Sequence, residues 1–153
     1  MLVATERQEQ FFPETALPTS EWGCHKMLHD KFAPDHLPCI LHTNPTEVIA
    51  LSHTGLFQHQ NKLNETLGSL LPEWELFLPA GIATAPYAKA GSVLLAELSA
   101  RHIMDKNALI WPKHGLLVRA ENPDKALDLT EVVTKAAALY LLSCGISRSL
   151  SSR

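Results

Sequence analysis

Among the eight histidines of this 153-residue chain, two stand where a side chain could do chemistry. His42 and His114 each follow an apolar segment, at the junction of a predicted strand and a turn. Active-site side chains are common at such sheet ends, where the strands hold them on a rigid base. Imidazole is also the most common metal ligand among side chains. Spacing alone leaves the role of each histidine open, because solvated imidazoles also occur at turns.

The other histidines need no functional explanation. His25 and His29 lie four residues apart on one face of a predicted helix, which is a spacing that metals use. No acid of the HExxH type lies between them, so a partly exposed helix face is the favoured interpretation. The remaining histidines lie in polar or helix-end segments, where imidazoles are usually solvated: His36, His53, His59 and His102.

Asn44 stands two residues after His42, where a second histidine would complete a His-x-His pair of metal ligands. Local physics offers another role for it. Asparagine is a good helix N-cap, proline is favoured at the first helical position, and a glutamate two residues later strengthens the start. The segment from Asn44 to Glu47 has all three features, and Asn122-Pro123-Asp124 is nearly the same arrangement. The sequence therefore predicts that Asn44 caps a helix.

Three acidic residues are the remaining candidates. Glu21 follows Thr19 and Ser20 at a predicted helix start, where it would complement the helix dipole and where the exposed N–H groups could hold an anion such as phosphate. Glu73 and Glu75 flank a tryptophan, and a solvated edge is the simpler interpretation for both. No GxSxG, P-loop or GxGxxG motif is present, so the sequence does not support nucleophilic serine or cysteine chemistry.

Helices and strands alternate along the chain, with some strands separated only by turns. This order predicts a mixed sheet with helices packed against it. Helices are expected over residues 22–32, 45–53, 92–103 and 123–144, the last one capped by Gly145. Strands are expected over residues 37–43, 76–79, 108–112 and 116–120.

Composition excludes several classes of protein. Lys+Arg 13 against Asp+Glu 16 gives a net charge of −3, and the absence of a basic stripe argues against a nucleic-acid partner. The longest apolar run, Ala136 to Leu142, is too short to span a bilayer, and the charged N-terminus does not resemble a signal peptide. The three cysteines are far apart and form no CxxC pair, which is typical of reduced thiols. We therefore expect a cytoplasmic protein without a membrane partner.

Four segments together carry a resemblance to a known family. Their order and spacing resemble the class II aldolase/adducin family over Pro18 to Ile146. The segments are PTSE (18–21), LHTNPTEVIALSH (41–53), LPAGIATAPY (78–87) and LIWPKHGLLVRAENPDKALDLTE (109–131).

The resemblance implies a three-layer α/β/α domain with a mixed central sheet, incomplete at its N-terminus, over residues 19–146. Residues 1–18 would form an N-terminal arm or remnant, and residues 147–153 a flexible tail. It further implies a homotetramer with active sites between subunits. The implied activity is zinc-dependent cleavage of a phosphorylated ketose. The WPKHG segment favours L-rhamnulose 1-phosphate, which would yield dihydroxyacetone phosphate and L-lactaldehyde; fuculose phosphate and pentulose phosphates are alternatives.

The resemblance also assigns the site residues. Zinc would be held by His42, Asn44 and His114, although the asparagine weakens the site because a neutral amide is a poorer ligand than imidazole. The remaining roles are catalytic for Glu21 and Glu73 and phosphate-binding for Thr19 and Ser20. The family's glycine- and asparagine-containing phosphate loop has no counterpart here. These departures leave an alternative open, a catalytically inactive family member that serves as an assembly or binding module.

Overall fold

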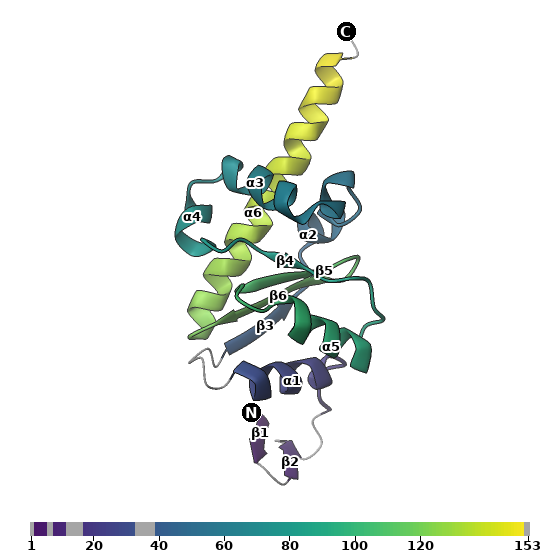
Figure 1. Ribbon diagram of the computed structural model, residues 1–153, viewed down its shortest axis with the longest axis vertical. Helices are drawn as coiled ribbons and strands as arrows, with labels where there is room; N and C mark the ends of the chain where they lie inside the picture. The colour runs from purple at the N-terminus through teal and green to yellow at the C-terminus, as the bar shows by residue number, and fades with distance from the viewer. Residues whose placement is uncertain (1, 6–7, 12–16, 33–38, 152–153) are drawn as a thin grey trace.

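The computed structural model describes residues 2–5, 8–11, 17–32 and 39–151. A four-stranded sheet lies between two layers of helices (Figure 1). The strands are β1 (Leu2–Thr5), β2 (Gln8–Phe11), β3 (Cys39–Thr43), β4 (Ala83–Thr84), β5 (Ala108–Trp111) and β6 (Gly115–Ala120). The helices are α1 (Trp22–Phe32), α2 (Thr46–Leu51), the 3-10 helix η2 (Gly55–Gln58), α3 (Gln60–Leu70), α4 (Glu73–Phe77), α5 (Val93–His102) and α6 (Pro123–Ser151).

The sheet is mixed, as the sequence predicted. Its strand order is β3-β6-β5-β4, with β6 antiparallel to both β3 and β5, and β4 parallel to β5. Because β6 alone runs in the opposite direction, the carboxyl ends of β3, β5 and β4 meet at one edge of the sheet. A tight corner joins β5 to β6 and holds Lys113 in the left-handed region, at φ 64°. This edge carries both histidines singled out in the sequence.

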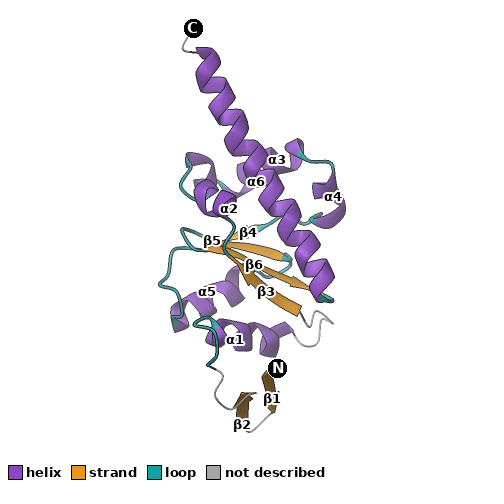
Figure 2. Cartoon of the chain, turned by 180° about the vertical axis from the view of Figure 1, so that it is seen from behind, coloured by secondary structure: helices purple, strands orange, loops and turns teal. Residues whose placement is uncertain are grey.

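Alternate side chains of each strand enter two separate cores. Ile110 and Leu116 join the cluster under α2, α3, α4 and α6, whereas Leu109 and Leu117 join the cluster under α1 and α5. Since helices cover both faces, every residue of β5 and β6 is buried. Figure 2 shows the same layers from behind. The expected three-layer α/β/α architecture is confirmed.

Two helix starts follow the predicted chemistry. The hydroxyl of Ser92 accepts a hydrogen bond from the Leu95 N–H at the start of α5 (3.1 Å), and the side-chain oxygen of Asn122 accepts one from the Lys125 N–H at the start of α6 (2.9 Å). Such caps satisfy backbone donors that the first helical turn leaves unpaired.

Two other element predictions were wrong. The segment 76–79, expected as a strand, instead holds the last two residues of α4 and the start of the turn after it. Trp74 is buried and Leu76 is exposed, and short apolar runs do not distinguish a strand from a helix by periodicity. Gly145 does not cap α6, because this helix continues to Ser151 and projects beyond the layered body (Figure 1). A mid-helix glycine costs only about 1 kcal/mol, which the rest of a long helix offsets.

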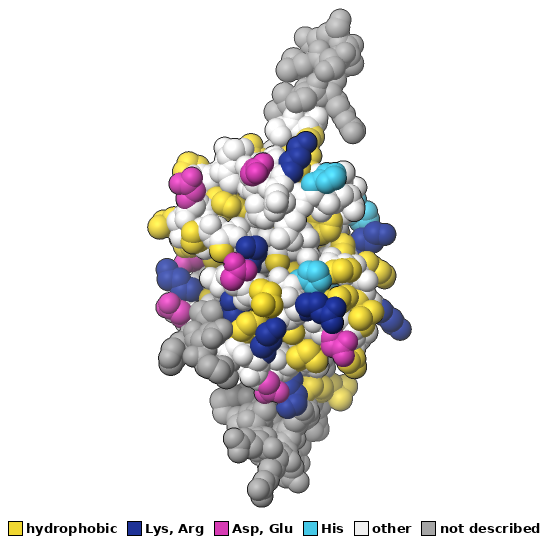
Figure 3. Space-filling model, viewed as in Figure 1, with side chains coloured by type: hydrophobic (Ala, Val, Ile, Leu, Met, Phe, Trp, Pro, Cys, Tyr) yellow, Lys and Arg dark blue, Asp and Glu magenta, His cyan; other side chains and the backbone are white. Residues whose placement is uncertain are grey.

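The N-terminal arm contains an antiparallel pair, β1 with β2, that lies beyond α1 (Figure 1). His36 falls outside the described residues, as do the first two residues of the strand expected over 37–43. On the face shown in Figure 3, basic and acidic side chains are interspersed. Within the described part of the chain, no helix is long and apolar enough to cross a membrane.

Candidate active site

The site is built where β3 ends and the β5–β6 corner begins. His42 is on β3, and its ring centroid lies 4.8 Å from that of His114 in the corner, with the two rings nearly perpendicular at 72°. The indole ring of Trp111, the last residue of β5, packs against both imidazoles. Two residues that are 72 positions apart in sequence therefore lie side by side, as the family resemblance implied.

His42 is fixed in one tautomer. Its Nδ1 lies 3.0 Å from the Leu116 carbonyl oxygen and must carry the proton that it donates, so Nε2 carries a lone pair and no proton. Burial lowers the pKa of His42, and His114 lowers it further, although the Leu116 carbonyl and Glu21 oppose the shift. A neutral imidazole whose second nitrogen bonds a backbone carbonyl is the usual state of a metal-binding histidine.

Glu21 brings a carboxylate to the same place from the start of α1. Its residue is only 3% exposed, which is rare for a glutamate unless its oxygens have partners. Oε2 accepts the Gly91 N–H (3.2 Å), and Oε1 lies 3.8 Å from His114 Nε2. Gly91 has φ +71°, and a side chain there would press on the Ser20 carbonyl at 3.0 Å. A tight turn thus supports the buried carboxylate.

Thr19 and Ser20 lie beside Glu21 and are exposed. The Thr19 hydroxyl accepts the Glu21 N–H (3.3 Å), and the Ser20 hydroxyl lies 3.4 Å from Glu21 Oε1. The three residues expected from the PTSE segment are therefore contiguous in space, at the N-terminal end of an eleven-residue helix.

Asn44 does not cap α2, so that prediction was wrong. The residue at the N-cap position is Pro45, in an extended conformation, and no side chain caps the helix. The Asn44 amide nitrogen instead donates to the His114 carbonyl (2.8 Å) and lies 3.2 Å from His42 Nε2. A cross-site hydrogen bond replaces the local one and ties the end of β3 to the β5–β6 corner.

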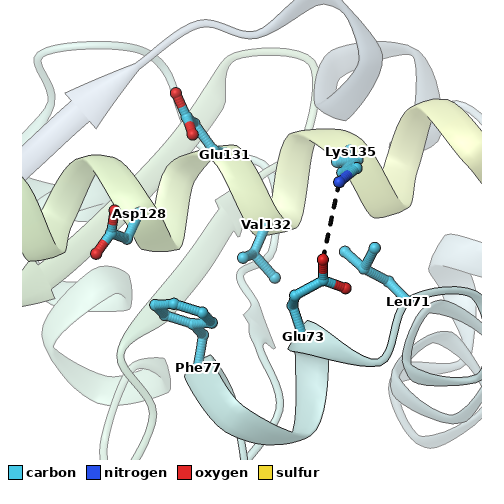
Figure 4. A pocket seen from close by; sticks show the side chains of 7 residues that line it. All are labelled: Leu71, Glu73, Phe77, Asp128, Glu131, Val132 and Lys135. Atoms are coloured by element: carbon cyan, nitrogen blue, oxygen red, sulfur yellow. Dashed lines mark ion pairs between the residues drawn. The ribbon is translucent and has the colours of Figure 1, made fainter.

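Glu73 is not brought to the histidines within this chain. It begins α4, on the opposite face of the sheet from α1 (Figure 1), and its carboxylate lies 3.9 Å from Lys135 Nζ on α6. Figure 4 shows both side chains at a cavity of about 190 Å³ between the two helices, which Leu71, Phe77 and Val132 also line. A shared site with Glu21 would require Glu73 to come from another subunit.

Two residues near the site escaped the sequence interpretation. The N–H of His25 donates to the Glu21 carbonyl one helical turn earlier (3.0 Å); the residue is half-buried, and its pKa is lowered by burial and then by His42 and His29. Its i,i+4 spacing from Glu21 was the available signal. Trp111 was visible only as a strand residue, since nothing in the sequence shows which rings it touches.

The histidines fit a divalent metal and Asn44 does not. The lone pair of His42 Nε2 faces only the Asn44 amide (3.2 Å), which a metal could displace, and the buried Nδ1 of His114 has no hydrogen-bond partner among the described residues. The Asn44 amide, by contrast, turns its N–H2 group toward His42, because the bond to the His114 carbonyl requires a donor. No cluster of three or more His, Cys, Asp or Glu side chains in the described ranges could hold a metal ion.

These features define an α/β/α domain with a histidine and carboxylate site at the carboxyl ends of its strands. The family model described as the Class II Aldolase and Adducin N-terminal domain matches residues 2–141. The chain belongs to the class II aldolase family, which confirms the family prediction.

Proteins similar in sequence to this chain are named as aldolases. The rhamnulose-1-phosphate aldolase of Bacteroides thetaiotaomicron is 32% identical over 130 residues, covering 84% of this chain and 48% of the relative. That of Listeria welshimeri is 35% identical, covering 81% and 45%. The chain thus spans about half the length of these relatives.

Solved structures agree with this fold. A sugar-phosphate aldolase from Thermotoga maritima has a TM-score of 0.78 at 30% identity and covers 86% of this chain and 56% of its own. An L-fuculose 1-phosphate aldolase has a TM-score of 0.68 at 25% identity, with 85% and 56% covered.

Proposed function

We propose that this chain acts as a cytoplasmic, zinc-dependent aldolase that cleaves L-rhamnulose 1-phosphate into dihydroxyacetone phosphate and L-lactaldehyde. The observation that carries the proposal is the buried Glu21 carboxylate 3.8 Å from His114, whose ring packs against His42. The names of the similar proteins favour this substrate over other ketose phosphates.

In this proposal, His42 and His114 hold the metal and Asn44 contributes no ligand atom in its present orientation. A bound zinc ion supplies a Lewis acid that stabilises negative charge on the ketone oxygen of the substrate. Two protein imidazoles are one fewer than the usual three protein ligands of a catalytic zinc, so we expect weak binding.

Glu21 is the proton carrier of the proposed reaction. Cleavage removes a proton from the C4 hydroxyl, breaks the C3–C4 bond to leave lactaldehyde, and returns a proton to C3 of the enediolate to give dihydroxyacetone phosphate. Oε2 is held by Gly91, so Oε1, on the His114 side, is the atom that takes up and releases the proton. Positioned acid–base groups of this kind typically contribute about 10²–10⁴-fold in rate.

The substrate phosphate would bind at the start of α1. Thr19 and Ser20 expose hydroxyls there, and a helix N-terminus favours anions. Glu73 can take part only from a neighbouring subunit, which links its proposed role to a homo-oligomer, a tetramer by family resemblance.

A second candidate is a catalytically inactive family member that serves as an assembly or binding module. The orientation of Asn44 favours it, because amide protons rather than a lone pair face His42 Nε2.

Zinc content and turnover separate the two functions. The purified chain is measured for bound zinc and for lactaldehyde release from L-rhamnulose 1-phosphate, with and without added zinc. The aldolase proposal expects zinc-stimulated release that Glu21→Gln lowers by at least about 10²-fold. A protein that stays inactive at saturating zinc supports the binding module instead. Glu75→Gln, on the far face of the sheet, is the matched carboxylate control.

A further inference from the structure

Trp111 is the one described side chain whose ring contacts both imidazoles of the site. Its ring centroid lies 4.6 Å from that of His42 and 5.0 Å from that of His114, at interplanar angles of 42° and 31°. The residue is 1% exposed, so its ring is enclosed by protein. Any rotation of the indole must therefore move the imidazoles or the core.

The indole is held from behind by Ser99 on α5. Trp111 Nε1 donates to the Ser99 hydroxyl (2.8 Å), and that hydroxyl donates to the Leu95 carbonyl one turn earlier (2.6 Å). The single hydroxyl proton is thereby committed to the carbonyl, so the lone pair faces the indole N–H. Ser99 is fully buried, which makes it costly to leave either partner unsatisfied.

The packing of Trp111 matters more for His114 than for His42. The Nδ1 of His42 is fixed by the Leu116 carbonyl, whereas the buried Nδ1 of His114 has no partner within the described part of the chain. The orientation of the His114 ring therefore depends on its packing against Trp111 and His42 and on the carboxylate of Glu21.

We propose that Ser99 and Trp111 are positioning residues of the active site: Ser99 sets the indole plane, and the indole sets the orientation of the two imidazoles. This inference rests on the proposed function for its metal-binding consequence only. Neither residue touches the reacting atoms. The alternative is a purely structural role, in which Ser99 accepts the hydrogen bond of the buried indole N–H and contributes only to stability.

The test is a double-mutant cycle with a matched control. Ser99→Ala removes the acceptor, Trp111→Phe keeps a ring but removes the N–H, and both are combined. Thr130→Val is the control, because the Thr130 hydroxyl is also buried and also donates to a carbonyl four residues earlier, but lies on α6 in the other core. Ser99→Thr restores the hydroxyl.

Two measurements are made on the full chain. The first is the set of histidine ring nitrogen and proton signals in NMR spectra without metal, which report the surroundings of each imidazole. The second is Co²⁺ affinity from visible absorption. We expect Ser99→Ala to shift the His42 and His114 signals and to weaken Co²⁺ binding by about tenfold, the usual effect of substituting a residue that supports a metal ligand without binding the metal. Ser99→Thr should restore both, and Thr130→Val should change neither.

The cycle decides whether Ser99 acts through the indole. If it does, adding Ser99→Ala to Trp111→Phe changes nothing more, since the N–H is already gone. Independent, additive shifts overturn the inference, and so do unchanged histidine signals in a folded Ser99→Ala protein. If Ser99→Ala does not fold, Trp111→Phe alone must shift both histidines, or the inference fails. A wild-type chain that binds no Co²⁺ contradicts the proposed metal, while the metal-free spectra still decide the positioning role.

Discussion

Replacing Gly115 by alanine tests how closely the β5–β6 corner packs against the end of β3. An added Cβ would collide with the Thr43 carbonyl oxygen of the neighbouring strand. It would also lie 2.9 Å from the Asn44 amide nitrogen and 3.1 Å from His42 Cε1. The closest neighbour is backbone, so the strands must separate or the corner must shift.

The expected cost follows from these contacts. Forcing an extra carbon into a packed region typically costs about 1–3 kcal/mol. Pushing Asn44 away also breaks its hydrogen bond to the His114 carbonyl, which is worth about 1 kcal/mol. Gly115→Ala should therefore lower the free energy of unfolding by about 2–4 kcal/mol, which a domain with about 5–15 kcal/mol survives at 25 °C.

Urea unfolding followed by circular dichroism measures this loss of stability. Zinc affinity should fall as well, because the added carbon would displace His42, a proposed zinc ligand. Gly23→Ala is the control, because nothing lies within 4 Å of the added carbon and its position in α1 favours alanine by up to about 1 kcal/mol. If Gly115→Ala unfolds at the wild-type urea concentration and binds zinc equally well, the packing argument for this corner is wrong.

Three further predictions concern the site and the sheet. Asn44→His should tighten zinc binding by more than about tenfold, because even substitutions of residues that only hydrogen-bond to metal ligands change metal affinity by about 10–100-fold. Unchanged affinity in a zinc titration would show that this turn is not a metal site. The lowered pKa values of His25 and His42 mean that the unfolded chain protonates first. Stability should therefore be full above pH about 6.5 and fall as pH drops toward the folded pKa values, with a shallower fall in His25→Asn; a flat urea-unfolding profile from pH 7 to 5 would contradict this. Asn64→Ala removes two hydrogen bonds to the Ile82 backbone and should cost about 2–3 kcal/mol in urea unfolding with zinc affinity unchanged.

The sequence predicted the fold well where apolar periodicity marks the core. In the helix expected over residues 123–144, the apolar residues Ala126, Val133 and Ala137 recur at helical spacing and are fully buried. The corner between β5 and β6 was also predicted from its turn residues. The buried face of α5 is less evident from the sequence: Leu95 is buried, but Leu94 is 54% exposed while the small residue Ala96 packs inside. Local hydrophobicity does not show that α5 lies against α1, where small residues allow close approach.

The sequence predicted individual residues of the site but not the contacts between them. His42, His114 and Glu21 were recognised from strand ends, a helix start and the family resemblance, and the structure brings them together. The hydrogen bond from Trp111 to Ser99 and the pairing of Glu73 with Lys135 depend on contacts between distant segments. Nothing in the local sequence encodes such contacts.

Asn44 shows how magnitudes decide between local and distant effects. A helix cap and a cross-site hydrogen bond are each worth about 1 kcal/mol, so a partner 70 residues away can replace the local one. The same comparison shows that the Asn44 bond does not by itself exclude a metal. Zinc binding releases about 10–16 kcal/mol in complete structural sites, far more than the cost of turning one amide. In the proposed zinc site the missing ligand is a third imidazole, which Asn44→His would supply.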